Sequence, residues 1–295
     1  MHQHLWPAAF VAQLRRRTQP PYLRDWTLHT DGEAPYPISP DDHDPLARRD
    51  LDPHADRVLV SISSPLGIEY LPPEQAEPLL DAWHEGVQEL GAPFAGWAAV
   101  SHVEPDLDGL KVLLADGEDR LVGLQVPATA LATPTELERL APVLRVCEEL
   151  DRPVLVHPGP VAPTANVPPW WPAVVDYPAQ LQAAWWSWHQ AGRALLPELR
   201  ICFAAGAGLA PVHHERYAAR ATPGRLVVDR NTFVETSSYG RQGVDALIRA
   251  LGIDVIVLGS DRPYAEPLHD PHLGDAAQRA IRIDNPTRLL RGERP

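Results

Sequence analysis

Two histidines separated by a single residue, His2 and His4, stand at the beginning of the chain. In a β-strand, alternate side chains point to the same face, so His2 and His4 would project together while Gln3 faces away. Two neighbouring imidazoles can bind a divalent cation such as zinc and leave other positions for a carboxylate, a water or a substrate. The alternative is a pair of polar residues at a frayed chain end.

Two further residues with metal-binding side chains stand at the ends of apolar runs. His157 closes one such run and a proline follows it, and Asp261 follows a second run. Taken singly, such residues are more often a buried core histidine and a loop carboxylate. Taken with His2 and His4, they make a set of nitrogen and oxygen ligands suited to zinc or a similar cation.

Most of the chain alternates between short apolar runs and helical patterns, which favours β-α-β units and a parallel sheet. Several runs are almost continuously apolar, as expected of strands buried on both faces. We predict strands at His2–Leu5, Arg57–Ser61, Phe94–Val100, Leu121–Val126, Val154–His157, Arg200–Ala204, Phe233–Thr236 and Val255–Gly259. Eight strands close a TIM barrel, so we expect a single α/β domain over residues 1–295, a (β/α)8 barrel with a truncated first strand.

Helical patterns fill the intervals between these strands. The segment Thr133-Pro134-Thr135-Glu136 has an N-cap threonine, a proline at the first helical position and a glutamate at the third. It predicts a helix that runs to about Leu150. The other predicted helices are Glu74–Leu90, Ala179–Leu196, Pro211–Ala221, Gly243–Leu251, His272–Ile283 and Pro286–Leu290.

The long irregular connections all follow strands, whereas the helix-to-strand turns are short. These connections are residues 8–55, 158–178 and 262–271. In a barrel, all strand-to-helix loops lie on the rim where active sites are found. We therefore expect the first two connections to cover a site that includes Asp261, with a loosely packed surface loop as the alternative for residues 8–55.

Composition excludes several classes of protein. Hydrophobic residues make up 44% and charged residues 22%, as in ordinary globular proteins. The formal net charge of −13 argues against a nucleic-acid partner. Two cysteines in apolar patterns, no signal segment and no long apolar run predict a cytoplasmic protein that does not enter a membrane.

The chain resembles the amidohydrolase superfamily, in particular the branch that includes the aminocarboxymuconate-semialdehyde decarboxylases. The motifs that carry the resemblance are spread in order over the chain: His2-Gln3-His4-Leu5, Val156-His157-Pro158, Glu235–Gly240, Gly259–Pro263 and Asn285–Leu290. The resemblance implies a distorted TIM barrel. It also implies one divalent metal ion, which we expect to be zinc, held by His2, His4, His157 and Asp261.

The sequence departs from the family pattern at the end of the sixth strand. Members usually carry a catalytic histidine there, but the position falls on Ala205 or Gly206 in this chain. Neither residue can transfer a proton or bind a metal. His213 and His214, at the start of the following helix, are candidate substitutes, and His102 after the third strand is another. The alternative is that all three are ordinary solvated side chains.

We predict substrate contacts from aromatic and basic residues near the expected rim, namely Trp6, Trp170, Trp171 and Arg262. The neighbouring Trp185 and Trp188 share a helix face. Tryptophans in this region could form an aromatic wall over a small-molecule substrate. The alternative is packing between helices or in the interface of a homodimer.

The function that we predict first is hydrolysis of a small ester, amide or lactone by a metal-activated water. Asp261 would act as the general base and pass the proton to the leaving group. One alternative is non-oxidative decarboxylation of a small aromatic or unsaturated carboxylic acid. The missing histidine favours a second alternative, a non-catalytic barrel that binds a ligand.

Overall fold

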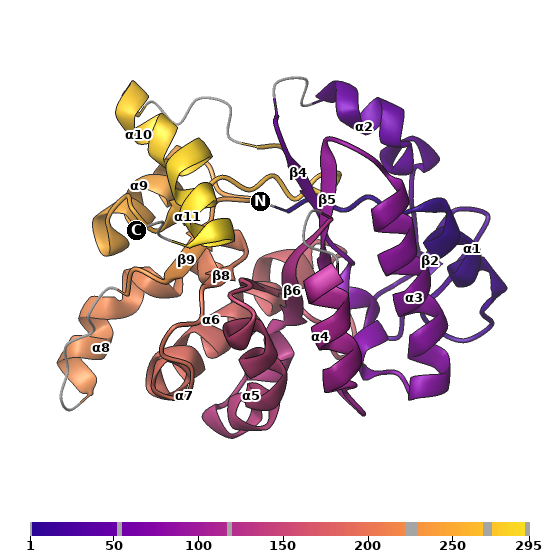
Figure 1. The fold of residues 1–295 in the computed structure, drawn as a ribbon, viewed down its shortest axis with the longest axis horizontal. Helices are drawn as coiled ribbons and strands as arrows, with labels where there is room; N and C mark the ends of the chain where they lie inside the picture. The colour runs from indigo at the N-terminus through magenta and orange to yellow at the C-terminus, as the bar shows by residue number, and fades with distance from the viewer. Residues whose placement is uncertain (1, 52–54, 117–119, 222–228, 268–272, 293–295) are drawn as a thin grey trace.

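The computed structural model describes residues 2–51, 55–116, 120–221, 229–267 and 273–292. A seven-stranded parallel sheet, in the order β10-β9-β8-β7-β6-β5-β4, forms the centre of the molecule (Figure 1). Its strands are β4 (Val58–Val60), β5 (Phe94–Ala98), β6 (Leu121–Pro127), β7 (Val154–His157), β8 (Ile201–Phe203), β9 (Thr232–Glu235) and β10 (Ile256–Val257). The strand order follows the chain order, and every residue of these strands is buried. The prediction of a distorted TIM barrel is confirmed.

The N-terminal segment closes this sheet between its two edge strands. The Gln3 N–H donates to the carbonyl of Leu59 at 2.9 Å, and the Ser61 N–H donates to the carbonyl of Gln3 at 2.8 Å. On the other side, the His4 N–H donates to the carbonyl of Arg262 at 2.6 Å. The predicted first strand is therefore a single parallel bridge with backbone partners on both sides.

Alternation along this segment sets the directions of its side chains. The Gln3 amide oxygen accepts a hydrogen bond from Arg48 at 2.5 Å, away from the cavity described below. His2 and His4 both line that cavity. The predicted alternation of these three residues is confirmed.

Helices cover the outside of the sheet (Figure 1). They are α3 (Pro73–Glu89), α4 (Leu107–Asp116), α5 (Pro134–Glu149), α6 (Tyr177–Ser187), α7 (Arg193–Leu195), α8 (His214–Arg220), α9 (Arg241–Leu251), α10 (Asp275–Arg279) and α11 (Asn285–Arg291). At the start of α5 the Thr133 hydroxyl accepts from the Glu136 N–H at 3.2 Å, so the predicted cap is confirmed. The prediction missed α4. His272, the predicted start of one helix, lies outside the described residues.

The first long connection is more regular than the sequence suggested. It contains α1 (Ala8–Arg16), an antiparallel sheet of β1 (Tyr22–Arg24), β2 (Thr27–His29) and β3 (Tyr36–Pro37), and α2 (Pro45–Leu51). The expectation of an irregular loop over residues 8–55 was wrong.

Helix α1 and the β1–β2 turn, which open this connection, both pack against residues far away in the chain. Helix α1 buries Phe10 against Trp83 of α3, with ring centroids 5.9 Å apart. The β1–β2 turn has Asp25 and Trp26 at φ of 47° and 60°. A type I′ turn usually has Asn or Gly at such positions. Trp26 adopts it here with its ring stacked on His43 at a centroid distance of 6.0 Å.

No helix among the described residues has the length and apolarity needed to cross a lipid bilayer.

Candidate metal centre

Four side chains that the sequence predicted as metal ligands meet at one end of the barrel. One ligand atom from each of His2, His4, His157 and Asp261 lies within 4.8 Å of all the others. The three imidazole rings have centroids 5.0 to 5.5 Å apart. Asp261 Oδ1 lies 3.2 Å from His2 Nε2 and 3.1 Å from His4 Nε2. This arrangement presents the atoms that bind divalent cations in proteins.

Each histidine is oriented by a contact to its other ring nitrogen. His157 Nδ1 lies 2.9 Å from the carbonyl oxygen of Pro158. His4 Nδ1 lies 3.2 Å from the carbonyl oxygen of Ser61, and the Ser63 hydroxyl is at the same distance. A carbonyl accepts only from a protonated Nδ1, which leaves Nε2 as the free ligand atom. The donor set therefore fits a cation in both atom type and tautomer.

The third histidine, His2, is oriented by a carboxylate on β9. Glu235 Oε1 lies 3.3 Å from His2 Nδ1, and both side chains are buried. The same carboxylate accepts from the Ala205 N–H at 2.7 Å and from the N–H and hydroxyl of Ser237. A Cβ at Gly259 would lie 1.1 Å from Glu235 Oε2, so only glycine leaves room for this carboxylate. Carboxylates commonly hold metal-binding histidines in this way.

The electrostatics of the cluster favour positive charge at its centre. Burial alone would lower the pKa of His2, but the charges of Glu235 and Asp261 together raise it to about 9. Burial likewise opposes ionisation of the two carboxylates. Hydrogen bonds from His2 and His4 nevertheless hold the pKa of Asp261 well below its usual range, and the charge of His2 lowers the pKa of Glu235 to about 2. Burial lowers the pKa of His157 to about 3, so this imidazole is a neutral ligand.

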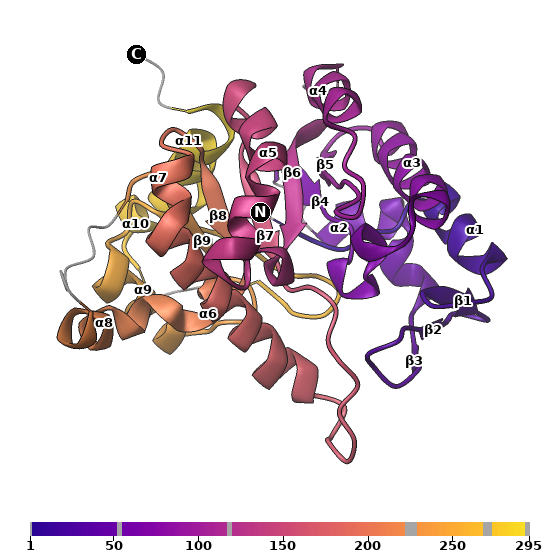
Figure 2. The ribbon, with the colours of Figure 1, turned by 90° about the horizontal axis from the view of Figure 1, so that it is seen from below.

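The cluster forms one wall of a cavity of about 580 Å³. Residues of the first long connection, from Thr30 to Tyr36, line the cavity together with residues from Pro158 to Pro178. Figure 2 shows the β1–β3 sheet and the segment that leads into α6 on the same side of the molecule. The prediction that both connections lie on the rim of Asp261 is confirmed.

Two predicted substrate contacts, Trp6 and Arg262, do not line this cavity. Trp6 is 1% exposed, its ring stacks on His43 at 4.5 Å, and its indole N–H donates to the Ser63 hydroxyl at 3.2 Å. Arg262 is buried and forms an ion pair with Glu266 at 3.0 Å. The two prediction errors have different causes: the segment turns into α1 after His4, so Trp6 packs in the core against His43, whereas Arg262 follows Asp261 directly and points to the other side.

The other two predicted contacts, Trp170 and Trp171, also lie outside the cavity wall, and the Trp170 ring is 55% exposed. The cavity side of this connection is formed by its prolines and small apolar residues instead. Trp185 and Trp188 are almost fully buried and pack in the core, as the alternative interpretation of the tryptophans expected.

The end of the sixth strand, where the resembling family has a histidine, carries no titratable side chain. Ala205 lines the cavity at this position. Neither His213 nor His214 lines it: His213 is exposed, and the His214 ring packs on Trp185 with centroids 5.8 Å apart. His102 packs edge-on against Tyr70, also outside the cavity wall. These three histidines are therefore not substitutes for the missing group.

Glu235 has no role among the sequence-based predictions, although this residue orients His2. A charged residue at the end of an otherwise apolar strand was the available signal. The predicted site residues also did not include Glu33, Tyr36, Tyr177 and Tyr264, which line the cavity. No local pattern identifies them, because they come from three segments far apart in the chain that only the tertiary fold brings together.

A second buried carboxylate, Glu69, lies behind the cavity wall that Ser63 and Leu66 form. Glu69 is 0% exposed and accepts a hydrogen bond from the Ser64 hydroxyl. Its second oxygen has no hydrogen-bond partner among the described residues. Burial raises the pKa of Glu69 to about 7, against the opposing effect of Ser64, so the carboxyl group holds a proton at mildly acidic pH.

We expect the Glu69→Gln variant to lose part of the pH dependence of stability. A carboxyl group whose pKa rises from 4.5 to about 7 on folding stabilises the fold fully below pH 4.5 and loses that contribution as the pH rises through 7. The loss amounts to roughly 3 kcal/mol at most. Urea unfolding at several pH values should show this decline in the wild type and not in the variant. Glu85→Gln, at an exposed position on α3, should behave like the wild type; equal declines in all three proteins would contradict the assignment.

Comparison with known proteins agrees with the fold and the cluster. The family model for amidohydrolases matches residues 1–292, so the chain belongs to the amidohydrolase family. A curated relative, the 2-amino-3-carboxymuconate-6-semialdehyde decarboxylase of Dictyostelium discoideum, is 25% identical over 157 residues. The match covers 49% of this chain and 44% of the relative, less than half of either protein.

Solved structures with the same fold cover most of the chain. The IDCase of Metarhizium anisopliae in its apo form has a TM-score of 0.79 and 16% identity, over 99% of this chain and 96% of its own. A 5-carboxyvanillate decarboxylase from Novosphingobium aromaticivorans, with bound manganese and 3-methoxy-4-hydroxy-5-nitrobenzoic acid, has a TM-score of 0.63 and 17% identity, over 82% and 80%. At these identities the likeness establishes the fold.

Proposed function

We propose that the protein is a metal-dependent decarboxylase of a small aromatic or unsaturated carboxylic acid. The observation that carries the proposal is the convergence of three histidines and Asp261 on one wall of a cavity that two long connections cover. Proteins that share the family or the fold include decarboxylases, and one of them contains manganese. These likenesses support the second of our sequence-based functions and give no support to hydrolysis, the first.

The residues present fit a divalent cation, with His2, His4, His157 and Asp261 as its ligands. Zinc is the metal that the sequence suggested. Manganese is the metal bound in the structure of the Novosphingobium 5-carboxyvanillate decarboxylase. When bound, such a cation supplies a positive charge that holds a carboxylate and stabilises negative charge as it develops next to it.

The chain's own residues would bind the acid, keep water away and carry the proton. Small apolar residues and prolines of the second connection form much of the wall, among them Val161, Val167 and Pro168. Loss of carbon dioxide spreads the charge of a carboxylate over a larger group, and an apolar wall favours that change. Hydrolysis would instead need water in the same place.

Decarboxylation ends with a proton on the carbon that carried the carboxylate. Asp261 is the carboxylate of the cavity wall that touches His2 and His4, and it is 22% exposed, so it is placed to pass a proton from solvent to that carbon. Because Ala205 stands where a histidine could share this role, we assign it to Asp261, the carboxylate of that wall in contact with the histidine cluster.

Two measurements on the purified protein test the proposal. Elemental analysis should find about one divalent cation per chain. Incubation with hydroxybenzoic, aminobenzoic and unsaturated aliphatic acids should release carbon dioxide from at least one of them. A protein that contains no cation, even after manganese or zinc is supplied, would overturn the proposal. A protein that contains the cation and hydrolyses esters or lactones, but releases no carbon dioxide, would establish hydrolysis instead.

A further inference from the structure

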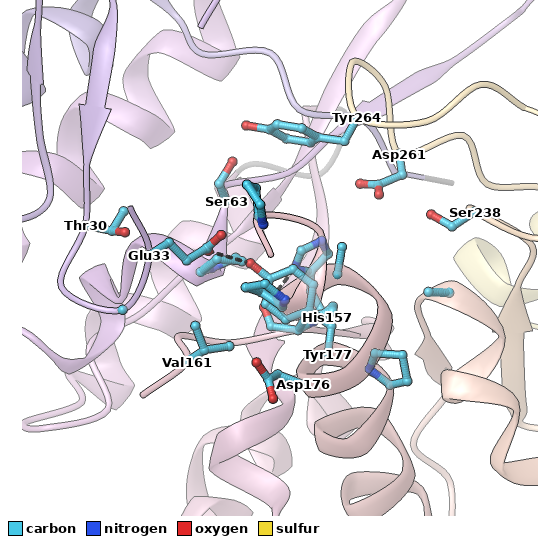
Figure 3. Close-up of a pocket in the computed structure, with 18 of the residues that line it drawn as sticks. Thr30, Glu33, Ser63, His157, Val161, Asp176, Tyr177, Ser238, Asp261 and Tyr264 are labelled. Carbon is cyan, nitrogen blue, oxygen red and sulfur yellow. Dashed lines mark hydrogen bonds between the residues drawn. The ribbon is translucent and has the colours of Figure 1, made fainter. Parts of the chain in front are cut away.

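The two connections that cover the cavity meet at Glu33. A Cβ at the preceding residue, Gly32, would lie 2.0 Å from the carbonyl oxygen of Val161, so the two backbones pack directly on each other. Beside this contact the Tyr177 hydroxyl donates to Glu33 Oε1 at 2.8 Å (Figure 3). Glu33 is therefore a fixed part of the cavity wall.

The second oxygen of Glu33 remains available to a ligand. Among the described residues, Tyr177 is the only group that donates to this carboxylate, and it uses Oε1. Figure 3 shows Glu33 reaching toward Tyr177 from the first connection, with Asp261 on the far side of the labelled residues. A carboxylate oxygen accepts strong hydrogen bonds from hydroxyl and amino groups.

The cavity has the histidine cluster at one end and, within the described part of the chain, carboxylates without cationic side chains at the end near Glu33. The described residues of its wall include two carboxylates away from the histidine cluster, Glu33 and Asp176, and neither lysine nor arginine. Tyrosines stand beside Glu33 and remain neutral: burial and the charge of Glu33 raise the pKa of Tyr36 to about 12 and that of Tyr177 further. A negative group at this end would therefore meet repulsion without any compensating cation.

We propose that Glu33 determines substrate specificity by accepting a hydrogen bond from the end of the substrate that lies away from the histidine cluster. The substrate would be an acid whose carboxylate faces His2, His4 and His157 and whose opposite end carries a hydroxyl or amino group. A second carboxylate at that end would be rejected. The inference rests on the proposed function, because it assumes that a carboxylate binds at the cluster.

Calorimetric titration of the manganese-loaded protein tests this inference without turnover. The probes are benzoate as the reference acid, 3- and 4-hydroxybenzoate, and the matching benzene-1,3- and benzene-1,4-dicarboxylates. The wild type should bind at least one hydroxybenzoate about tenfold or more tightly than the corresponding dicarboxylate. In Glu33→Gln this ratio should fall about tenfold, because the amide accepts a weaker hydrogen bond and repels no carboxylate. Glu33 is partly exposed in a loop, so the barrel should fold without its charge.

The matched control is Asp31→Asn, which removes an exposed carboxylate of the same connection that lies outside the cavity wall. It should preserve the preference for the hydroxybenzoate. A ratio in Glu33→Gln equal to that of the wild type would overturn the role of Glu33, as would an equal loss of the ratio in Asp31→Asn. If benzoate itself fails to bind, the proposed function falls together with this inference; if benzoate binds and the ratio does not change, only the role of Glu33 is overturned.

Discussion

Replacement of both His2 and His4 by alanine should reduce the divalent cation content from about one per chain to nearly zero. The two imidazoles supply half of the donor set, and Asp261 Oδ1 lies within 3.2 Å of both Nε2 atoms. The remaining pair, one histidine and one carboxylate, is too small a set to hold a cation through purification. Elemental analysis of the purified variant measures the loss.

The control for this experiment is a second pair of histidines. His213→Ala/His214→Ala removes two imidazoles outside the cavity wall and should keep its metal. The variant without His2 also leaves Glu235 buried without its ion-pair partner, so its melting temperature should fall. Circular dichroism establishes that the barrel is still formed. Metal retained at the wild-type level by folded His2→Ala/His4→Ala protein would contradict the ligand assignment.

The Asp261→Asn variant should lose a factor of roughly 10²–10⁴ in turnover, the usual size of general acid–base catalysis. Asparagine keeps the shape of the side chain and one oxygen ligand, but it cannot carry the proton. It also tolerates the backbone of this position, where φ is 60°, because Asn and Asp adopt left-handed conformations more readily than other residues do. Metal content should therefore fall much less than in the double histidine variant.

The rate should be measured with whichever acid is decarboxylated, under saturating metal. Asp176→Asn is the matched control, since Asp176 also lines the cavity and has no contact with the histidine cluster among the described residues. It should change turnover far less than Asp261→Asn. Full activity in Asp261→Asn would mean that another group carries the proton, and Tyr239 or Tyr264 in the cavity wall would be tested next.

Several features of the site could be predicted because local patterns encode them. The alternation His2-Gln3-His4 fixes two imidazoles on one face wherever this segment is extended, and the apolar runs before His157 and Asp261 place both residues at strand ends. In parallel strands these ends meet at one rim, so four ligands could be predicted to meet before any of their distances were known. The threonine cap of α5 follows from residues three positions apart, which is why its prediction was also correct.

Other features depend on contacts between residues far apart in the chain, and the sequence does not express these contacts locally. The N-terminal segment closes the barrel only because β4 and the residues after β10 both offer backbone partners to it. The direction of Trp6 and Arg262, away from the cavity, depends on which face of each segment packs on the core. Backbone pairing and core packing join residues that are far apart in the chain, so no local periodicity of the sequence predicts them.

The contacts around the ligands and the far end of the cavity were likewise decided by the tertiary structure. Glu235 orients His2 across two strands, and the Gly259 backbone leaves the space for its carboxylate. Glu33 and Tyr177 lie 144 positions apart and meet only when both connections fold over the barrel. The sequence by itself thus determined which atoms can bind a metal and at which rim they lie, because strand periodicity is local. The fold decided what surrounds the metal and what the cavity admits, because those contacts join residues far apart in the chain.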